Sequence, residues 1–164
     1  NPDNYYLVKK KFLSTNDLKP VMTVSVSSRE EILVKNNAVL SEKGLLGRII
    51  SQGLFNAEVM LVQDSRSLIP VVSSTSRLHA ILQGSGLSRL GHLNNIKKSA
   101  EYKIGEELYS SGIGGVYPSG YPVAKIKAIK DNPDNEFLDI QVVFLQSPID
   151  QDYFLVKKSI QVDE

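Results

Sequence analysis

Residues 110–123 constrain the fold of this chain more than any other stretch, because they contain four glycines and two prolines. Glycine adopts positive φ and permits close backbone approach, whereas proline fixes φ and removes a backbone donor, so a helix is excluded. We predict a tightly turned connection between two strands, whose shape depends on backbone rather than on reactive side chains. Its candidate structural or partner-binding residues are Gly112, Gly114, Gly115, Tyr117, Pro118, Gly120, Tyr121 and Pro122.

Short segments of alternating apolar and polar residues recur along the chain. Residues 22–26 place apolar side chains at even positions and hydroxyls at odd ones, which is typical of a strand with one buried face. Residues 123–129 and 138–144 alternate similarly. About ten such segments, separated by turns, predict an all-β sandwich or barrel, or two small barrels. The segment from Leu87 to Ile96 is ambiguous, because leucines spaced by three also fit a short helix.

Composition excludes several classes of protein. The chain has 164 residues, of which 41% are hydrophobic and 23% charged, as in a globular domain or two small ones. The lack of cysteine excludes disulfides and thiolate catalysis. A net charge of +1, without aromatic residues among the lysines, argues against nucleic acid as a partner. No apolar run reaches the roughly 18 residues that span a bilayer, so we expect this piece to be soluble by itself.

Patterns for catalysis and metal binding are weak. His79 and His92 are the only histidines, and their spacing supplies no local pair of metal ligands. A serine with His79 and Asp64 is conceivable as a catalytic triad, but the Gly-x-Ser-x-Gly pattern is absent. Gly84-Ser85-Gly86 lacks the third glycine of a phosphate-binding loop, because Arg89 holds that position. We therefore expect no metal and no cofactor, and a serine hydrolase stays the alternative function.

The glycine-rich stretch resembles a signature of the rod shape-determining MreC family, Ser-Gly-Leu-Gly-Gly-x-Phe-Pro-x-Gly-Tyr-Pro-Val. Here Ile113 replaces the leucine and Tyr117 the phenylalanine. Further segments are similar to family patterns in the same order, namely residues 40–50, 59–64 with 69–71, 77–86 and 103–112. The chain departs from the family at Ser27–Asn37, where the family's glycines are absent.

The resemblance implies a fold and a role. The fold would be two small β-barrels of mainly antiparallel strands, arranged as in chymotrypsin-like proteases but without a catalytic site. The role would be a non-catalytic scaffold of the bacterial cell-elongation machinery on the periplasmic side of the inner membrane. The implied partners are further copies of itself in a homodimer or filament, a class B penicillin-binding transpeptidase, MreD and, through the full-length protein, MreB. An N-terminal membrane helix and a coiled coil, both outside this sequence, would anchor it.

From these patterns we predict a first barrel over residues 1–65 and a second over residues 66–164. The last strand, at about residues 138–158, has the alternative of returning to the first barrel. We expect self-association through exposed strand edges, since small sheets leave backbone groups unpaired. For Tyr117 and Tyr121 two interpretations stay open, one in which the rings plug a barrel end and one in which they anchor a partner.

Overall fold

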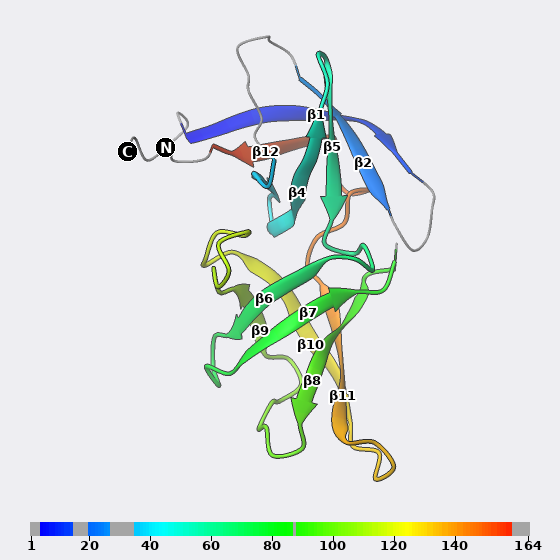
Figure 1. Ribbon diagram of the computed structural model, residues 1–164, viewed down its shortest axis with the longest axis vertical. Helices are drawn as coiled ribbons and strands as arrows, with labels where there is room; N and C mark the ends of the chain where they lie inside the picture. Colours follow the sequence, from blue (N-terminus) through cyan, green and yellow to red (C-terminus); the bar gives the residue numbers. More distant parts are fainter. Residues whose placement is uncertain (1–3, 15–19, 27–34, 87, 159–164) are drawn as a thin grey trace.

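A computed structural model describes residues 4–14, 20–26, 35–86 and 88–158 of the chain. These residues form twelve strands and contain no α-helix. The strands make two closed six-stranded barrels in which every pairing is antiparallel (Figure 1). The prediction of an all-β protein with two small barrels is therefore confirmed. Within the described ranges no helix is long and apolar enough to cross a membrane.

The first barrel draws its strands from both ends of the chain. In order around the barrel they are β1 (Tyr5–Leu13), β12 (Tyr153–Lys157), β3 (Ala38–Ser41), β4 (Gly44–Gln52), β5 (Asn56–Leu61) and β2 (Val21–Ser25). The seam is the pairing of β1 with β12, in which Tyr5 lies opposite Lys157 and Leu7 opposite Leu155. Alternation determines the buried face, since Met22 and Val24 of β2 point into the core.

The second barrel is built from one continuous stretch of chain. Its order is β10 (Pro122–Lys130), β11 (Phe137–Phe144), β8 (Leu90–Lys97), β7 (His79–Gly84), β6 (Leu68–Ser73) and β9 (Glu107–Ser110). Of residues 138–158, the part in β11 pairs with β10 and β8 of the second barrel, whereas the part in β12 pairs with β1 and β3 of the first.

Closure of both sheets contradicts one expectation. Each of the twelve described strands pairs on both of its sides, so none of them presents a free edge. The expectation of exposed strand edges was wrong because a closed barrel satisfies in its own ladder the backbone groups that an open sheet leaves unpaired.

The two barrels pack directly against each other. Leu40, Leu45 and Val62 of the first barrel belong to the same buried cluster as the core of the second. Gly44 lies so close to Pro122 that a Cβ atom there would be 2.2 Å from the Pro122 carbonyl oxygen. Gln63 Nε2 donates a 2.9 Å hydrogen bond to the backbone oxygen of Gln146 across the same contact. The barrels therefore share a packed interface, and the glycine-rich stretch lies beside it.

Candidate functional site

The glycine-rich loop, residues 110–123, connects β9 to β10 and is organised around Ser110. The buried Ser110 hydroxyl donates to the Pro118 carbonyl oxygen at 2.5 Å and accepts from the Tyr121 amide at 3.1 Å. The Ser110 amide donates to the Tyr121 carbonyl at 2.8 Å, and the Gly120 amide donates to the Ser110 carbonyl at 2.7 Å. One serine thus closes the base of the loop through four hydrogen bonds, which leaves the tip to project outward.

Four glycines of the loop adopt left-handed backbone conformations. Their φ values are +79° at Gly112, +83° at Gly114, +71° at Gly115 and +87° at Gly120. At Gly114 and Gly115 an added Cβ would meet no atom of the described residues within 4 Å, so a lack of space does not explain why these positions are glycine. The backbone conformation does, because residues with a Cβ atom rarely adopt positive φ.

Tyr117 points inward from the loop. Its side chain is only 4% exposed and belongs to the core cluster shared by the two barrels. Its hydroxyl lies 3.5 Å from Ser67 Oγ. Burial raises the pKa of Tyr117, while the hydrogen bond with Ser67 and the neighbouring Arg48 guanidinium partly offset that rise. This placement favours the packing interpretation for Tyr117, since a buried ring is not available to a partner.

Tyr121 occupies a different position, on the outer side of the contact between the barrels. The ring is half-buried, and its hydroxyl lies 3.2 Å from the Tyr5 hydroxyl at the start of β1. Lys157 of β12 places its ammonium group 5.4 Å from the centre of the Tyr121 ring, within the range of a cation–π interaction. Pro122 begins β10 opposite Tyr109. Tyr121 therefore connects the loop to the β1–β12 seam of the first barrel.

The tip of the loop exposes apolar side chains beside a groove. Ile113 is 58% exposed and Val116 is 41% exposed. The groove, of about 430 Å³, is lined on one side by loop residues from Gly112 to Ser119 and on the other by Asn36, Lys157 and their neighbours. Sequence reasoning singled out the glycines and tyrosines of this loop but not its exposed apolar tip.

A second exposed surface lies on the seam of the first barrel and was missed by sequence reasoning. Leu7 of β1 lies opposite Leu155 of β12, and both side chains are exposed, as is that of Tyr153. We call these three residues the β1–β12 patch. The available signal was the alternation in both segments, which carries apolar residues on the outward positions as well as on the inward ones.

The residues of the alternative catalytic triad are not brought together. Asp64 is fully buried and its carboxylate accepts hydrogen bonds from the Arg66 guanidinium, at 3.1 Å to Oδ1 and 2.7 Å to Oδ2. That hydrogen bond raises the pKa of Arg66. His79 is exposed on β7 in a pocket lined by Arg77 and several serines. Within the described part of the chain, His79 makes no hydrogen bond to a serine or a carboxylate, so no oriented base is assembled.

The geometry of metal binding is likewise absent from the residues that the structure describes. No group of three histidine, cysteine, aspartate or glutamate side chains converges there. His92 lies on β8 opposite Gln141 and Gln83 of the flanking strands. The segment Ser27–Asn37, in which the sequence departs from the family pattern, lies outside the described residues except for its last three positions.

Comparison with known proteins agrees with the geometry. Residues 13–158 match the family model described as "Rod shape-determining protein MreC, barrel core". The cell shape-determining protein MreC of Haemophilus influenzae is 28% identical over 135 residues, which are 82% of this chain and 38% of that protein. The chain thus spans less than half the length of this curated relative.

Solved structures resemble the whole described fold. The crystal structure of MreC from Pseudomonas aeruginosa superposes with a TM-score of 0.86 at 25% identity, covering 93% of this chain and 97% of that one. A structure described as a complex between penicillin-binding protein (PBP2) and MreC from Helicobacter pylori matches with a TM-score of 0.65 at 18% identity, covering 93% of this chain and 96% of that one. On the family match across most of its length, this chain belongs to the MreC family.

Proposed function

We propose that this chain is the periplasmic part of a non-catalytic scaffold, which maintains rod cell shape by binding copies of itself and a class B penicillin-binding transpeptidase. The observation that carries the proposal is the MreC barrel core, to which a relative in complex with PBP2 is similar in fold. The test is binding of the purified chain to the transpeptidase of the same organism by surface plasmon resonance. A signal equal to that of an unrelated β-barrel protein would contradict the proposal.

We propose further that the chain has no hydrolase activity. The buried Asp64–Arg66 ion pair does not include His79, which has no hydrogen-bond partner among the described residues. This supports the proposal, because a serine without an oriented base is a poor nucleophile. A serine-directed fluorophosphonate probe tests it. We expect no labelling above that of the heat-denatured chain, and specific labelling of one serine would refute the proposal.

For the transpeptidase contact we propose the tip of the glycine-rich loop, with Ile113 and Val116 as anchors. The hydrogen bonds of Ser110 hold the base of the loop in place, so its exposed apolar side chains lose little entropy on binding. Val116→Asp should abolish binding while the melting temperature changes little. Tyr117→Ala should instead lower the melting temperature by several degrees, because it removes a buried ring. Unchanged binding by Val116→Asp would exclude the tip.

For self-association we propose the β1–β12 patch as the contact with a second copy. Closed barrels offer no edge for strand addition among the described strands, so an association must use outward side chains. Leu7→Lys should shift the sedimentation of the chain toward the monomer at high concentration. The control is Leu54→Lys, at a leucine outside the patch that is 75% exposed, compared with 58% for Leu7. Equal effects of both substitutions would contradict the assignment.

The remaining partners belong to the whole protein. We propose that segments outside this sequence anchor the scaffold in the inner membrane by one helix, and that MreD and MreB are reached through the full-length protein. We also propose two domains, one of residues 1–65 completed by β12 and one of residues 66–146. The pairing of β12 with β1 and β3 supports this division. Co-purification of MreD with the full-length protein, but not with this chain, would be the expected result.

A further inference from the structure

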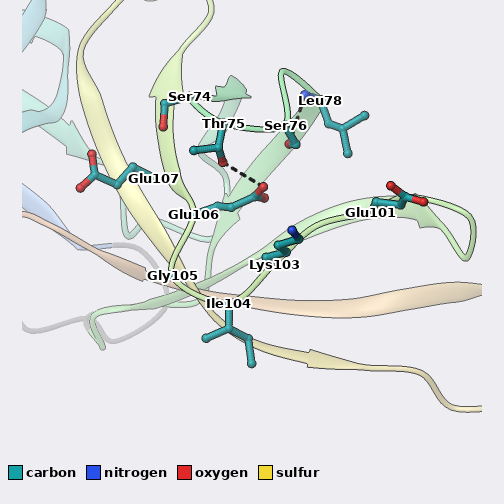
Figure 2. A pocket seen from close by; sticks show the side chains of 10 residues that line it. All are labelled: Ser74, Thr75, Ser76, Leu78, Glu101, Lys103, Ile104, Gly105, Glu106 and Glu107. Carbon is teal, nitrogen blue, oxygen red and sulfur yellow. Dashed lines mark hydrogen bonds between the residues drawn. The ribbon is translucent and has the colours of Figure 1, made fainter.

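The second barrel contains a pocket of about 760 Å³ on the side of the β6–β7 turn (Figure 2). One wall is the turn itself, with the hydroxyl side chains of Ser74, Thr75 and Ser76. The other wall is the segment from Glu101 to Glu107, which precedes and enters β9. We call this cavity the Glu106 pocket. It lies apart from the glycine-rich loop, and the function proposed above does not use it.

Glu106 is a buried carboxylate with an unsatisfied oxygen. Its side chain is 8% exposed, and Oε1 accepts a 3.0 Å hydrogen bond from the Thr75 hydroxyl. Oε2 is buried and has no hydrogen-bond partner among the residues that the structure describes. Figure 2 shows the carboxylate directed across the pocket toward the turn that carries Thr75. A buried carboxylate oxygen without a donor is costly, so the arrangement is incomplete as it stands.

A local turn holds Glu106 in this position. The Glu106 amide donates to the Lys103 carbonyl at 3.2 Å, and Gly105 between them has φ of +92°. These are the features of a type II turn, in which glycine is favoured at the third position. The Glu106 carbonyl accepts a 3.0 Å hydrogen bond from Ile126 of β10. These two hydrogen bonds therefore hold the Glu106 backbone in place, and with it the position from which the carboxylate enters the pocket.

The neighbouring donors and charges do not neutralise Oε2. The Tyr102 hydroxyl is also buried without a partner, and Lys103 makes no ion pair with Glu106 in the described structure. Glu107 is engaged elsewhere, by the Tyr109 hydroxyl at 2.9 Å and by Lys125 at 3.9 Å. With Glu101 also in the lining, the pocket has more carboxylates than cations. Its charge favours a positively charged occupant.

From these contacts we propose that the Glu106 pocket binds the ammonium group of a lysine-type side chain presented by a partner polypeptide. One free carboxylate oxygen among hydroxyl acceptors suits a compact group with three donors better than a planar guanidinium, which pairs with two carboxylate oxygens at once. A metal ion is disfavoured, since no three acidic or histidine side chains converge among the described residues. Leu78 in the lining supplies an apolar contact for the methylene stem of such a side chain.

The test is a nuclear magnetic resonance titration of the full 164-residue chain with Nα-acetyl-lysine methylamide. We expect saturable shifts at the amides of Thr75, Gly105 and Glu106. Nα-acetyl-norleucine methylamide, which has the stem without the charge, should bind about tenfold more weakly, because its stem leaves the carboxylate unpaired. Alanine methylamide, whose ammonium is on the α-carbon, should also bind more weakly. Tighter binding of alanine methylamide would overturn the assignment to a side chain.

Matched variants complete the test. Glu106→Gln keeps the shape and the acceptor for Thr75, and should weaken binding of the lysine probe about tenfold by removing the charge. Glu101→Gln, in the lining of the same pocket, should change the affinity for the lysine probe less than twofold. Lys103→Gln should leave binding unchanged or tighten it. If the norleucine probe binds as well as the lysine probe, or if Lys103→Gln abolishes binding, the pocket is not an ammonium site.

Discussion

The two barrels have the same number of strands but differ in how the chain closes them. The second barrel runs without interruption from Leu68 to Phe144, so all of its neighbours lie within one stretch of sequence. The first barrel needs β12, which follows the entire second barrel, to fill the gap between β1 and β3. The second barrel is therefore a local unit, whereas the first depends on a contact between the two ends of the described chain.

The order of the strands along the chain, and not their number, therefore decides which barrel can fold without the other. Bringing β12 to β1 closes a loop of more than a hundred residues, but the entropic cost rises only slowly with loop length. Much of that intervening chain is already ordered in the second barrel, and its core contacts Leu40 and Leu45 of the first. We therefore expect the second barrel to support the first rather than the reverse.

Removal of the last strand should have the largest effect on the first barrel. Deleting residues 147–164 takes Phe154 and Val156 out of the first core and leaves β1 and β3 each with one neighbour instead of two. We expect the first barrel to unfold and the second to keep its structure. In an amide correlation spectrum, dispersed signals from β2 and β5 should collapse while those of β7 and β8 persist. Persistence of the β2 and β5 signals would contradict the dependence.

Each barrel has one fully buried phenylalanine whose substitution should destabilise the protein. Phe154→Ala in the first barrel and Phe144→Ala in the second should each lower the free energy of unfolding by about 3–5 kcal/mol. The two substitutions should destabilise different parts of the molecule. Phe144 belongs to the cluster that includes Leu45 and Val62 of the first barrel, whereas Phe154 belongs to the separate core of the first barrel. Hydrogen exchange should accelerate in both barrels for Phe144→Ala and mainly in the first for Phe154→Ala.

Alkaline pH should weaken the interface between the barrels. Burial holds the pKa of Tyr117 above its ordinary value of 10.0, so the unfolded state releases this proton first as the pH rises. The protonated Tyr117 hydroxyl makes its full contribution to the free energy of unfolding below pH 10, and this contribution declines above pH 10. Denaturant melts at pH 8 and pH 11 should show this loss, and Tyr117→Phe should reduce it. An equal loss in Tyr117→Phe would assign the effect to other tyrosines.

The smallest expected effect concerns the glycine-rich loop of the second barrel. Gly115→Ala should cost about 1 kcal/mol, because φ is +71° although a methyl group would meet no atom. Gly53 in the turn between β4 and β5 of the first barrel is the matched control, since it has no positive φ and an added Cβ would make only an ordinary contact, 3.7 Å from the Asn56 carbonyl oxygen. Gly53→Ala should change the stability by less than half as much, and equal costs would refute the conformational argument.

Alternation predicted the strands that are regular. Leu138, Ile140, Val142 and Phe144 of β11 are all buried, as their spacing of two indicates. In β8 the same rule is hidden, because Leu93 and Ile96 are both buried at a spacing of three. The register explains it, since Leu93 pairs with Ile140 and Ile96 with Leu138, which leaves one extra residue in β8. Asn95, at φ of +55°, adopts the conformation that accommodates this bulge. The segment that also fitted a short helix is therefore a strand from Leu90 onward, with a bulge after Leu93.

Local sequence patterns could not predict the pairing partners of the last strand or which tyrosine of the glycine-rich loop is buried. The residues around Tyr153 do not by themselves indicate that this strand pairs with β1 and β3. The pairing depends on the gap between β1 and β3, which only the folded first barrel defines. Tyr117 and Tyr121 are four residues apart and of one type, yet Tyr117 is buried against Ser67 whereas Tyr121 meets Tyr5 at the surface. The backbone turns at Pro118 and Gly120 determine which tyrosine is buried, and amino-acid composition does not predict the geometry of these turns.

The seam of the first barrel also determines how the domain bears a mechanical load. The start of β1 and the end of β12 lie side by side, and the Lys158 amide donates a 2.8 Å hydrogen bond to the Asn4 carbonyl (Figure 1). A force that pulls these two ends apart acts across the ladder and ruptures its hydrogen bonds one after another, as in a zipper.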